Sequence, residues 1–120
     1  KWFGINTNGG IWMKKITSEE ELQQLLEHDV FLLLKHSLTC PISGAAFDEY
    51  SQFVDEHPAI ATAYLAVQEA KPLSEHVRDL TGIKHESPQA ILFKNSEPVW
   101  NTSHGRITAQ NLEQALKEYI

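Results

Sequence analysis

The segment LTCPISGA at residues 38–45 contains Cys40, the single cysteine in the 120 residues of the chain. A cysteine thiolate can attack the sulfur of a disulfide, so Cys40 could carry out thiol–disulfide exchange. Redox proteins with two thiols use the spacing Cys-x-x-Cys, but here Ser43 stands three residues after the cysteine. Because a serine cannot form a disulfide, exchange at Cys40 would have to proceed with one thiol from this chain.

The alternative is that Cys40 is a small buried core residue, as unpaired cysteines often are. Its surroundings favour reactivity, because a short apolar run ends just before it and Pro41 suits the first turn of a helix. The free N–H groups and the dipole at a helix N-terminus stabilise an anion, which would increase the thiolate fraction of Cys40. Taken alone, this position leaves the two interpretations evenly balanced.

The spacing of apolar residues predicts the elements that must position Cys40. Helices are expected at 17–29, 41–56, 71–82 and 107–120. Strands are expected at 29–37, at 59–67 and twice between 88 and 103, around the turn NSEP. Thr17 and Ser18 each precede a glutamate by three residues, so either could cap the first helix, and Thr108 is the expected N-cap of the last.

This order of elements predicts an α/β protein with a thioredoxin-like fold. The early alternation of strand and helix requires parallel strands with right-handed crossovers, and the late hairpin adds an antiparallel pair. The expected centre is a mixed sheet of four strands with helices on both faces. Residues 1–15 are expected to form an N-terminal extension, which could supply a fifth strand, and residues 16–120 to form the thioredoxin-like domain.

A second position supports a reactive Cys40. The thioredoxin fold places a cis proline immediately before the first strand of its final hairpin, packed against the active-site cysteine, and Pro88 in ESPQAILF occupies this point in the order. Only about 5–6% of X–Pro bonds in folded proteins are cis, so an ordinary trans proline would be the default. The combination with Cys40 reverses that default and predicts a cis bond at Pro88.

Two motifs, TCPIS at 39–43 and IKHESPQAILF at 83–93, resemble those of the YtxJ family, the monothiol bacilliredoxins of bacteria that use bacillithiol. The similarity in element order runs from about Ile16 to the C-terminus. The resemblance implies an oxidoreductase that removes bacillithiol from S-bacillithiolated client proteins through a mixed disulfide on Cys40. Bacillithiol is then the expected co-substrate and low-molecular-weight thiol partner, with no tightly bound cofactor.

The expected site surrounds Cys40 with its motif neighbours Thr39, Pro41, Ile42 and Ser43. The Ser43 hydroxyl could donate to the Cys40 sulfur, or it could be an ordinary polar residue of the first helical turn. A bound mixed disulfide is expected to pair with the backbone around the proline turn. The substrate-binding residues expected from this arrangement are Ser87, Pro88, Ser103 and His104.

Bacillithiol carries carboxylates, and cationic side chains near Cys40 could orient it. The candidates are Lys35, His36, His85 and Arg106. The competing interpretation of each is a solvated surface residue. Six histidines show no close ligand pair, and one cysteine is too few for a structural zinc site, so no metal site is expected.

Composition excludes several classes of partner. A net charge of −6 argues against general binding to nucleic acids or anionic membranes, which both require a basic surface. No apolar run approaches the roughly 18–20 residues that a membrane span requires. The single cysteine excludes an intrachain disulfide, which fits a reducing cytoplasm.

The sequence is compatible with other functions. The same chemistry could use glutathione, as in a monothiol glutaredoxin-like protein, because a Cys-x-x-Ser motif does not specify the thiol. An iron–sulfur cluster carrier is a second alternative, although Pro41 stiffens the position after the cysteine and argues mildly against it. A third is a redox-inactive binding module with the thioredoxin fold.

Overall fold

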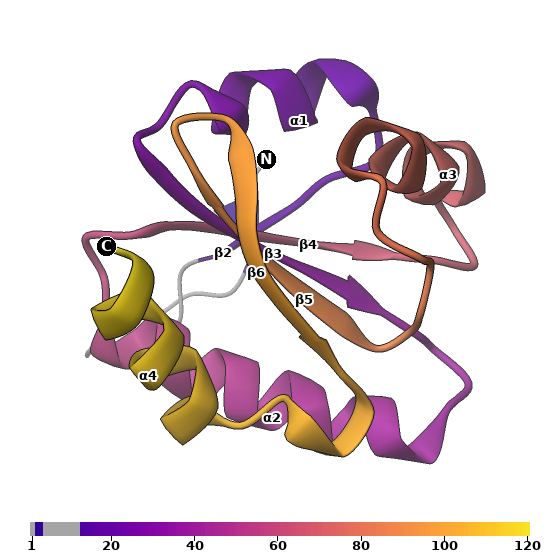
Figure 1. Cartoon of the computed structure of the whole chain (residues 1–120). Coiled ribbons are helices and arrows are strands. Elements are labelled where there is room, and N and C mark those ends of the chain that lie inside the picture. Colours follow the sequence, from indigo (N-terminus) through magenta and orange to yellow (C-terminus); the bar gives the residue numbers. More distant parts are fainter. Residues whose placement is uncertain (1, 4–12) are drawn as a thin grey trace.

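The computed structural model describes residues 2–3 and 13–120, and within them a six-stranded sheet has the order β1-β2-β4-β3-β5-β6. Helices cover both faces of this sheet, as the sequence predicts (Figure 1). The strands are β1 (Trp2–Phe3), β2 (Met13–Lys15), β3 (Val30–His36), β4 (Ala61–Ala66), β5 (Gln89–Lys94) and β6 (Glu97–Ser103). The helices are α1 (Glu19–Leu26), α2 (Pro41–Glu56), α3 (Lys71–Thr81) and α4 (Ala109–Tyr119), with a 3-10 turn η1 (His104–Arg106).

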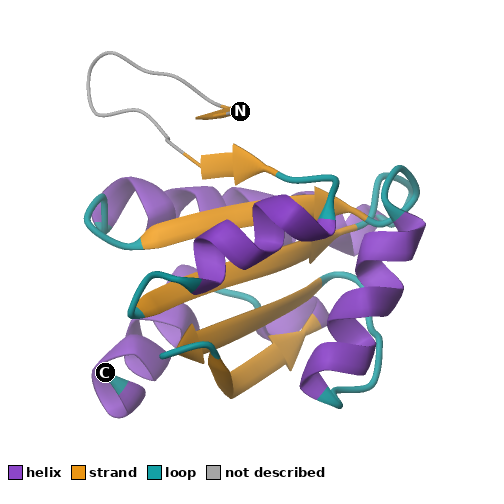
Figure 2. Ribbon diagram, turned by 90° about the horizontal axis from the view of Figure 1, so that it is seen from above, coloured by secondary structure: helices purple, strands orange, loops and turns teal. Residues whose placement is uncertain are grey.

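The sheet is mixed in the predicted way. β3 pairs with β4 in parallel, whereas β5 pairs antiparallel with both β3 and β6. These are the four strands expected from the sequence. β2 joins the free edge of β4 in parallel and β1 pairs with β2, so both additional strands lie at the edge nearest the N-terminus (Figure 2). The short β2 is specified by this pairing more than by its own apolar pattern.

Alternation along β3 divides the core into two layers. Leu32 and Leu34 pack toward α2 and α4, whereas Phe31 and Leu33 pack toward α1 and α3. Because successive side chains of a strand point to opposite faces, the run VFLLL fills both layers at once. This explains why the first five residues of the central strand are all apolar.

The helix that begins at Cys40 is anchored to the sheet by a buried tyrosine. The Tyr50 hydroxyl of α2 lies 3.0 Å from the Leu32 carbonyl oxygen and 2.7 Å from that of Ala63. Its burial raises the pKa of Tyr50, so the hydroxyl keeps its proton and remains a donor. These contacts fix α2 against β3 and β4.

The helix caps lie at residues that the sequence predicts, and they settle which of Thr17 and Ser18 caps α1. Ser18 caps α1 and accepts a hydrogen bond from the Glu21 N–H, while the Glu21 carboxylate accepts from the Thr17 N–H at 2.8 Å. Thr108 caps α4 as expected and accepts from the Asn111 N–H at 3.1 Å. α1 is shorter than the expected 17–29, because the polar residues after Leu26 offer no apolar face to bury.

Candidate active site

Four neighbouring strands have one of their ends on the same side of the molecule. His36 of β3 lies beside Ala66 of β4, and Lys35 lies opposite Gln89 at the start of β5. Gln89 in turn lies opposite Ser103 at the end of β6. Three connecting segments therefore meet at this end of the strands (Figure 1). They are the segment from β3 into α2, the proline turn before β5 and the turn after β6.

Cys40 lies at this end of the strands and is partly exposed. It is the N-cap of α2, with φ −90° and ψ 124°, and Pro41 follows at the first helical position. Within the described part of the chain, the Cys40 side chain makes no capping hydrogen bond. The sulfur therefore lies outside both core clusters, at the positive end of a helix of 16 residues.

The proline turn has the predicted geometry, since the Ser87–Pro88 peptide bond is cis. Pro88 is buried, and its carbonyl oxygen accepts a hydrogen bond from the His104 N–H at 3.0 Å. His104 has a positive φ of 54°, and its ring Nδ1 lies 3.5 Å from a carboxylate oxygen of Glu86. The structure thus brings Pro88 and His104 together, next to Ser103.

Ser43 has a different role from the two considered in the sequence. Its side chain is fully buried, and its oxygen accepts from the Ser37 N–H at 2.9 Å and lies 3.0 Å from His36 Nδ1. Among the described residues it makes no bond to the Cys40 sulfur, so that expectation is wrong. Burial, followed by the Lys15 charge, lowers the pKa of His36 and favours a neutral ring that can accept the Ser43 proton.

Gln68 is a structural partner of the cysteine loop that the sequence does not reveal. Its Oε1 accepts from the Leu38 N–H at 2.9 Å, and its Nε2 lies 3.0 Å from Ser37 Oγ and 3.2 Å from Thr39 Oγ1. One side chain just after β4 therefore holds three successive residues that lead into Cys40. No local sequence pattern indicates this role, because the contacts require β3 and β4 to be adjacent and parallel in the folded sheet.

The four candidate cationic residues do not form one cluster. His36 packs against the rings of Phe47 and Tyr64, with centroid distances of 4.8 Å and 6.1 Å, on the α2 side of the sheet. Arg106 lines a separate hollow beside α4 and β6. Lys35 and His85 remain as a pair on the α3 side.

Lys35 is buried among apolar residues of β3 and its neighbours, with 0% of its surface exposed. Burial, and to a smaller extent the Arg78 charge, lowers its pKa to about 8. Burial also lowers the pKa of His85, with further contributions from the charges of Lys35 and Arg78. Each lowered pKa therefore includes repulsion from at least one neighbouring cationic side chain.

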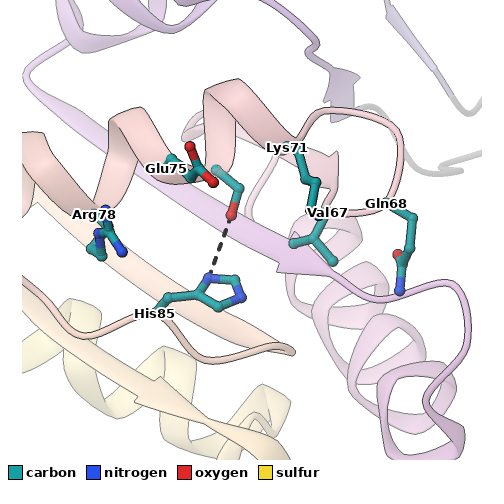
Figure 3. Close-up of a pocket in the computed structure, with 7 residues that line it drawn as sticks. Val67, Gln68, Lys71, Glu75, Arg78 and His85 are labelled. Carbon is teal, nitrogen blue, oxygen red and sulfur yellow. Dashed lines mark hydrogen bonds between the residues drawn. The ribbon is translucent and has the colours of Figure 1, made fainter.

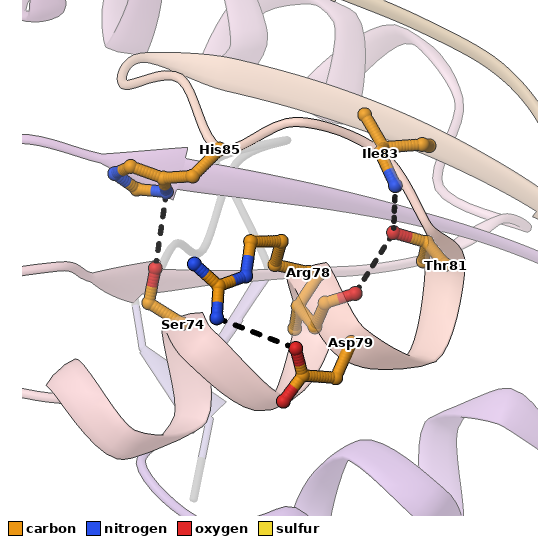
Figure 4. A network of polar contacts seen from close by, with 7 residues as sticks. Ser74, Arg78, Asp79, Thr81, Ile83 and His85 are labelled. Carbon is orange, nitrogen blue, oxygen red and sulfur yellow. Dashed lines mark hydrogen bonds and ion pairs between the residues drawn. The ribbon is translucent and has the colours of Figure 1, made fainter.

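A pocket of about 320 Å³ lies next to this pair, between α3 and the segment before β5 (Figure 3). His85 lies on one side of it, with its Nδ1 3.4 Å from Ser74 Oγ (Figure 4). The segment is positioned by Thr81, which donates to the Val77 carbonyl at 2.8 Å and accepts from the Ile83 N–H at 3.1 Å. Gly82 turns the chain with a φ of 71°, a conformation that favours glycine.

Two further observations concern metal ions and membranes. Residues 2–3 and 13–120 contain no group of three or more histidine, cysteine, aspartate or glutamate side chains that could hold a metal ion. In the same residues, none of the helices has the length and apolar character required to span a membrane.

Comparisons with solved structures show the fold. A protein with a thioredoxin fold, described as a candidate oxidoreductase, shares 41% identity with this chain at a TM-score of 0.82, covering 87% of this chain and 93% of the other. Thioredoxin from Malassezia sympodialis matches at 15% identity with a TM-score of 0.76 and 96% coverage of both chains. Mitochondrial thioredoxin 3 from Saccharomyces cerevisiae matches at 14% identity with a TM-score of 0.73, covering 88% and 94%. The thioredoxin-like fold expected from the sequence is therefore confirmed.

The family follows from a match along most of the sequence. The family model for the monothiol bacilliredoxin BrxC matches residues 14–112, a range that includes Cys40, Ser43 and Pro88. The 41% identical neighbour agrees with this assignment in fold and in its description as an oxidoreductase. The chain belongs to the monothiol bacilliredoxin family, a group of thioredoxin-fold oxidoreductases.

Proposed function

We propose that this protein removes bacillithiol from S-bacillithiolated proteins through a mixed disulfide on Cys40. The observation that carries the proposal is the position of Cys40, which is partly exposed at the N-terminus of α2 while Ser43 occupies the place of a second thiol. Membership of the monothiol bacilliredoxin family supports the choice of thiol.

The reaction needs two exchange steps. The Cys40 thiolate attacks the bacillithiol sulfur of the client mixed disulfide, the client sulfur leaves as a thiolate that takes up a proton, and Cys40 becomes bacillithiolated. The thiolate of a second bacillithiol then attacks the bacillithiol sulfur bound to Cys40. This step releases bacillithiol disulfide and regenerates the Cys40 thiolate, so each client thiol that is freed consumes one free bacillithiol.

Ser43 supports a one-thiol cycle in two ways, because it cannot form a disulfide with Cys40 and because its contacts position the helix that begins at Cys40. Its hydroxyl is occupied by His36 and the Ser37 N–H, so it fixes the first turn of α2 against the end of β3. Ser87 is partly exposed beside the cis bond, and we propose that its backbone groups pair with the extended arm of the mixed disulfide. His104 and Ser103 would lie beside the bound arm, because the His104 N–H donates to the Pro88 carbonyl.

The decisive experiment uses one client protein carrying bacillithiol on a single cysteine. We expect the wild-type protein to release the client thiol, measured by mass spectrometry, and Cys40→Ala to show complete loss of release while retaining its circular dichroism spectrum. Release that survives in Cys40→Ala would overturn the proposal. The same client carrying glutathione provides the comparison, because equal or faster release from it would favour a glutathione-dependent protein.

The proposed partners and location follow from this chemistry. The clients are proteins whose cysteines carry bacillithiol, and the reducing cytoplasm is the proposed location. A single cysteine and the absence of an intrachain disulfide are consistent with such a compartment.

A further inference from the structure

The pocket beside α3 has a charge that differs from that of the whole chain. Lys71 and Arg78 of α3 line it together with His85, and Glu75 is the one carboxylate among the described residues that line it (Figure 3). Asp79 lies 3.4 Å from the Arg78 guanidinium, and Glu86 raises the pKa of His85 slightly, so acidic groups lie near the pocket as well. A local excess of cationic side chains in a chain of net charge −6 nevertheless suits an anionic ligand.

Two buried polar atoms on β3 and β5 have no hydrogen-bond partner among the described residues. Lys35 and Gln89 face each other across β3 and β5, and both are buried. Within the described residues, Lys35 Nζ and Gln89 Oε1 have no hydrogen-bond partner, although Gln89 Nε2 donates to the Lys84 carbonyl at 3.0 Å. An unpartnered buried ammonium destabilises a fold, and an anionic ligand nearby would offset part of this cost.

The positions of these groups relate the buried lysine to the pocket. Lys35 follows Leu33 by two residues on β3, so its side chain points to the face of the sheet that α1 and α3 cover, and α3 also lines the pocket. The charges of Lys35 and Arg78 agree with this placement, because Lys35 lowers the pKa of His85 and Arg78 lowers that of Lys35. At pH 7 Lys35 therefore supplies a positive charge on the side of the sheet where the pocket lies. Arg78 is exposed on α3, and its planar guanidinium suits two hydrogen bonds to a carboxylate.

The pocket also adjoins the cysteine loop. Gln68 lines it and at the same time holds Ser37, Leu38 and Thr39, the residues that lead into Cys40. The volume of the pocket, about 320 Å³, lies at the small end of the range for small-molecule sites. A small ligand with a carboxylate at one end and a thiol at the other would therefore fit with its thiol end toward Cys40.

We propose that this pocket binds the carboxylate end of the low-molecular-weight thiol that exchanges with Cys40, with Arg78 as the direct partner and Lys35 as the buried supporting charge. The inference rests on the proposed function, because that function supplies an anionic thiol as co-substrate. It adds the residues that hold this thiol and separates them from the backbone groups that hold the client.

Binding can be measured without exchange in a Cys40→Ser background, with reduced bacillithiol as the probe in isothermal titration calorimetry. We expect Lys35→Met and Arg78→Gln each to raise the dissociation constant by about tenfold, the effect of losing one charged interaction. Lys94→Gln removes one charge at the opposite end of β5 and should leave the constant unchanged. No binding by the Cys40→Ser protein, or equal binding by all variants, would overturn the inference.

A kinetic arm separates this inference from the proposed function. With Cys40 intact, Lys35→Met and Arg78→Gln should slow exchange with bacillithiol, while exchange with 2-mercaptoethanol, which lacks a carboxylate, should keep its wild-type rate. Equal slowing with both thiols would contradict the inference and indicate a general effect on Cys40. Failure of the wild-type protein to release the bacillithiolated client would instead overturn the proposed function.

Discussion

Ser43 illustrates how a single residue can replace a thiol without leaving a gap in the structure. The second cysteine of a Cys-x-x-Cys motif would be a weak donor at this buried position, whereas the serine hydroxyl connects the end of β3 to α2. The residue therefore removes one reaction, formation of an internal disulfide, and strengthens the support of the remaining thiol. The motif Cys40–Pro41–Ile42–Ser43 specifies the first effect but gives no indication of the second.

Removal of this hydroxyl should be measurable as a loss of stability. Ser43→Ala leaves the Ser37 N–H and the His36 ring without their buried partner, so we expect the free energy of unfolding to fall by about 1–3 kcal/mol. Urea denaturation provides the measurement. Ser51→Ala is the matched control and should have a smaller effect, since Ser51 is also a buried serine of α2 but makes no comparable pair of contacts with the residues that the structure describes.

At the scale of elements, the sequence predicts the strands and helices but not how side chains connect them. The apolar run of β3, the proline at the start of α2 and the cap at Thr108 have local causes, and each is where the sequence places it. The contacts of Gln68 depend on β3 and β4 being adjacent and parallel, which is a property of the folded sheet. Glutamine at a strand end has no local signature, so this residue could not be identified from its neighbours.

Gln68 should restrict the motion of the loop that carries Cys40. Gln68→Ala removes the acceptor of the Leu38 N–H, and we expect hydrogen exchange at this amide to become at least several times faster because the loop opens more often. Two-dimensional NMR after transfer to deuterium oxide would measure the rate. The Asn95 N–H, which donates to the Asp29 carbonyl in a distant turn, should exchange at its original rate. An unchanged rate at Leu38 would show that Gln68 does not hold the loop.

For the whole molecule, the buried lysine makes stability depend on pH in a defined direction. The pKa of Lys35 is about 8 in the folded protein, whereas in the unfolded chain it takes the ordinary lysine value of 10.5. Between these values the unfolded chain binds more protons than the folded one, so the contribution of Lys35 to the free energy of unfolding rises as pH rises from about 8 toward 10. Below about pH 8 the folded protein holds the charged form, and the full cost of burying it is present.

Lys35→Met tests this directly, because methionine fills a similar volume without a charge. We expect the variant to be more stable than the wild type at pH 7, by about 1–3 kcal/mol, since an unpartnered buried charge is replaced by an apolar group. The difference should shrink as pH rises from 8 to 10, because the wild-type lysine becomes neutral in the fold. Parallel urea titrations at several pH values measure it, with Lys94→Met as the control at a less buried site. A difference that does not change with pH would contradict the lowered pKa. A more stable variant that binds bacillithiol less tightly would show that this fold retains a destabilising charge for the sake of its ligand.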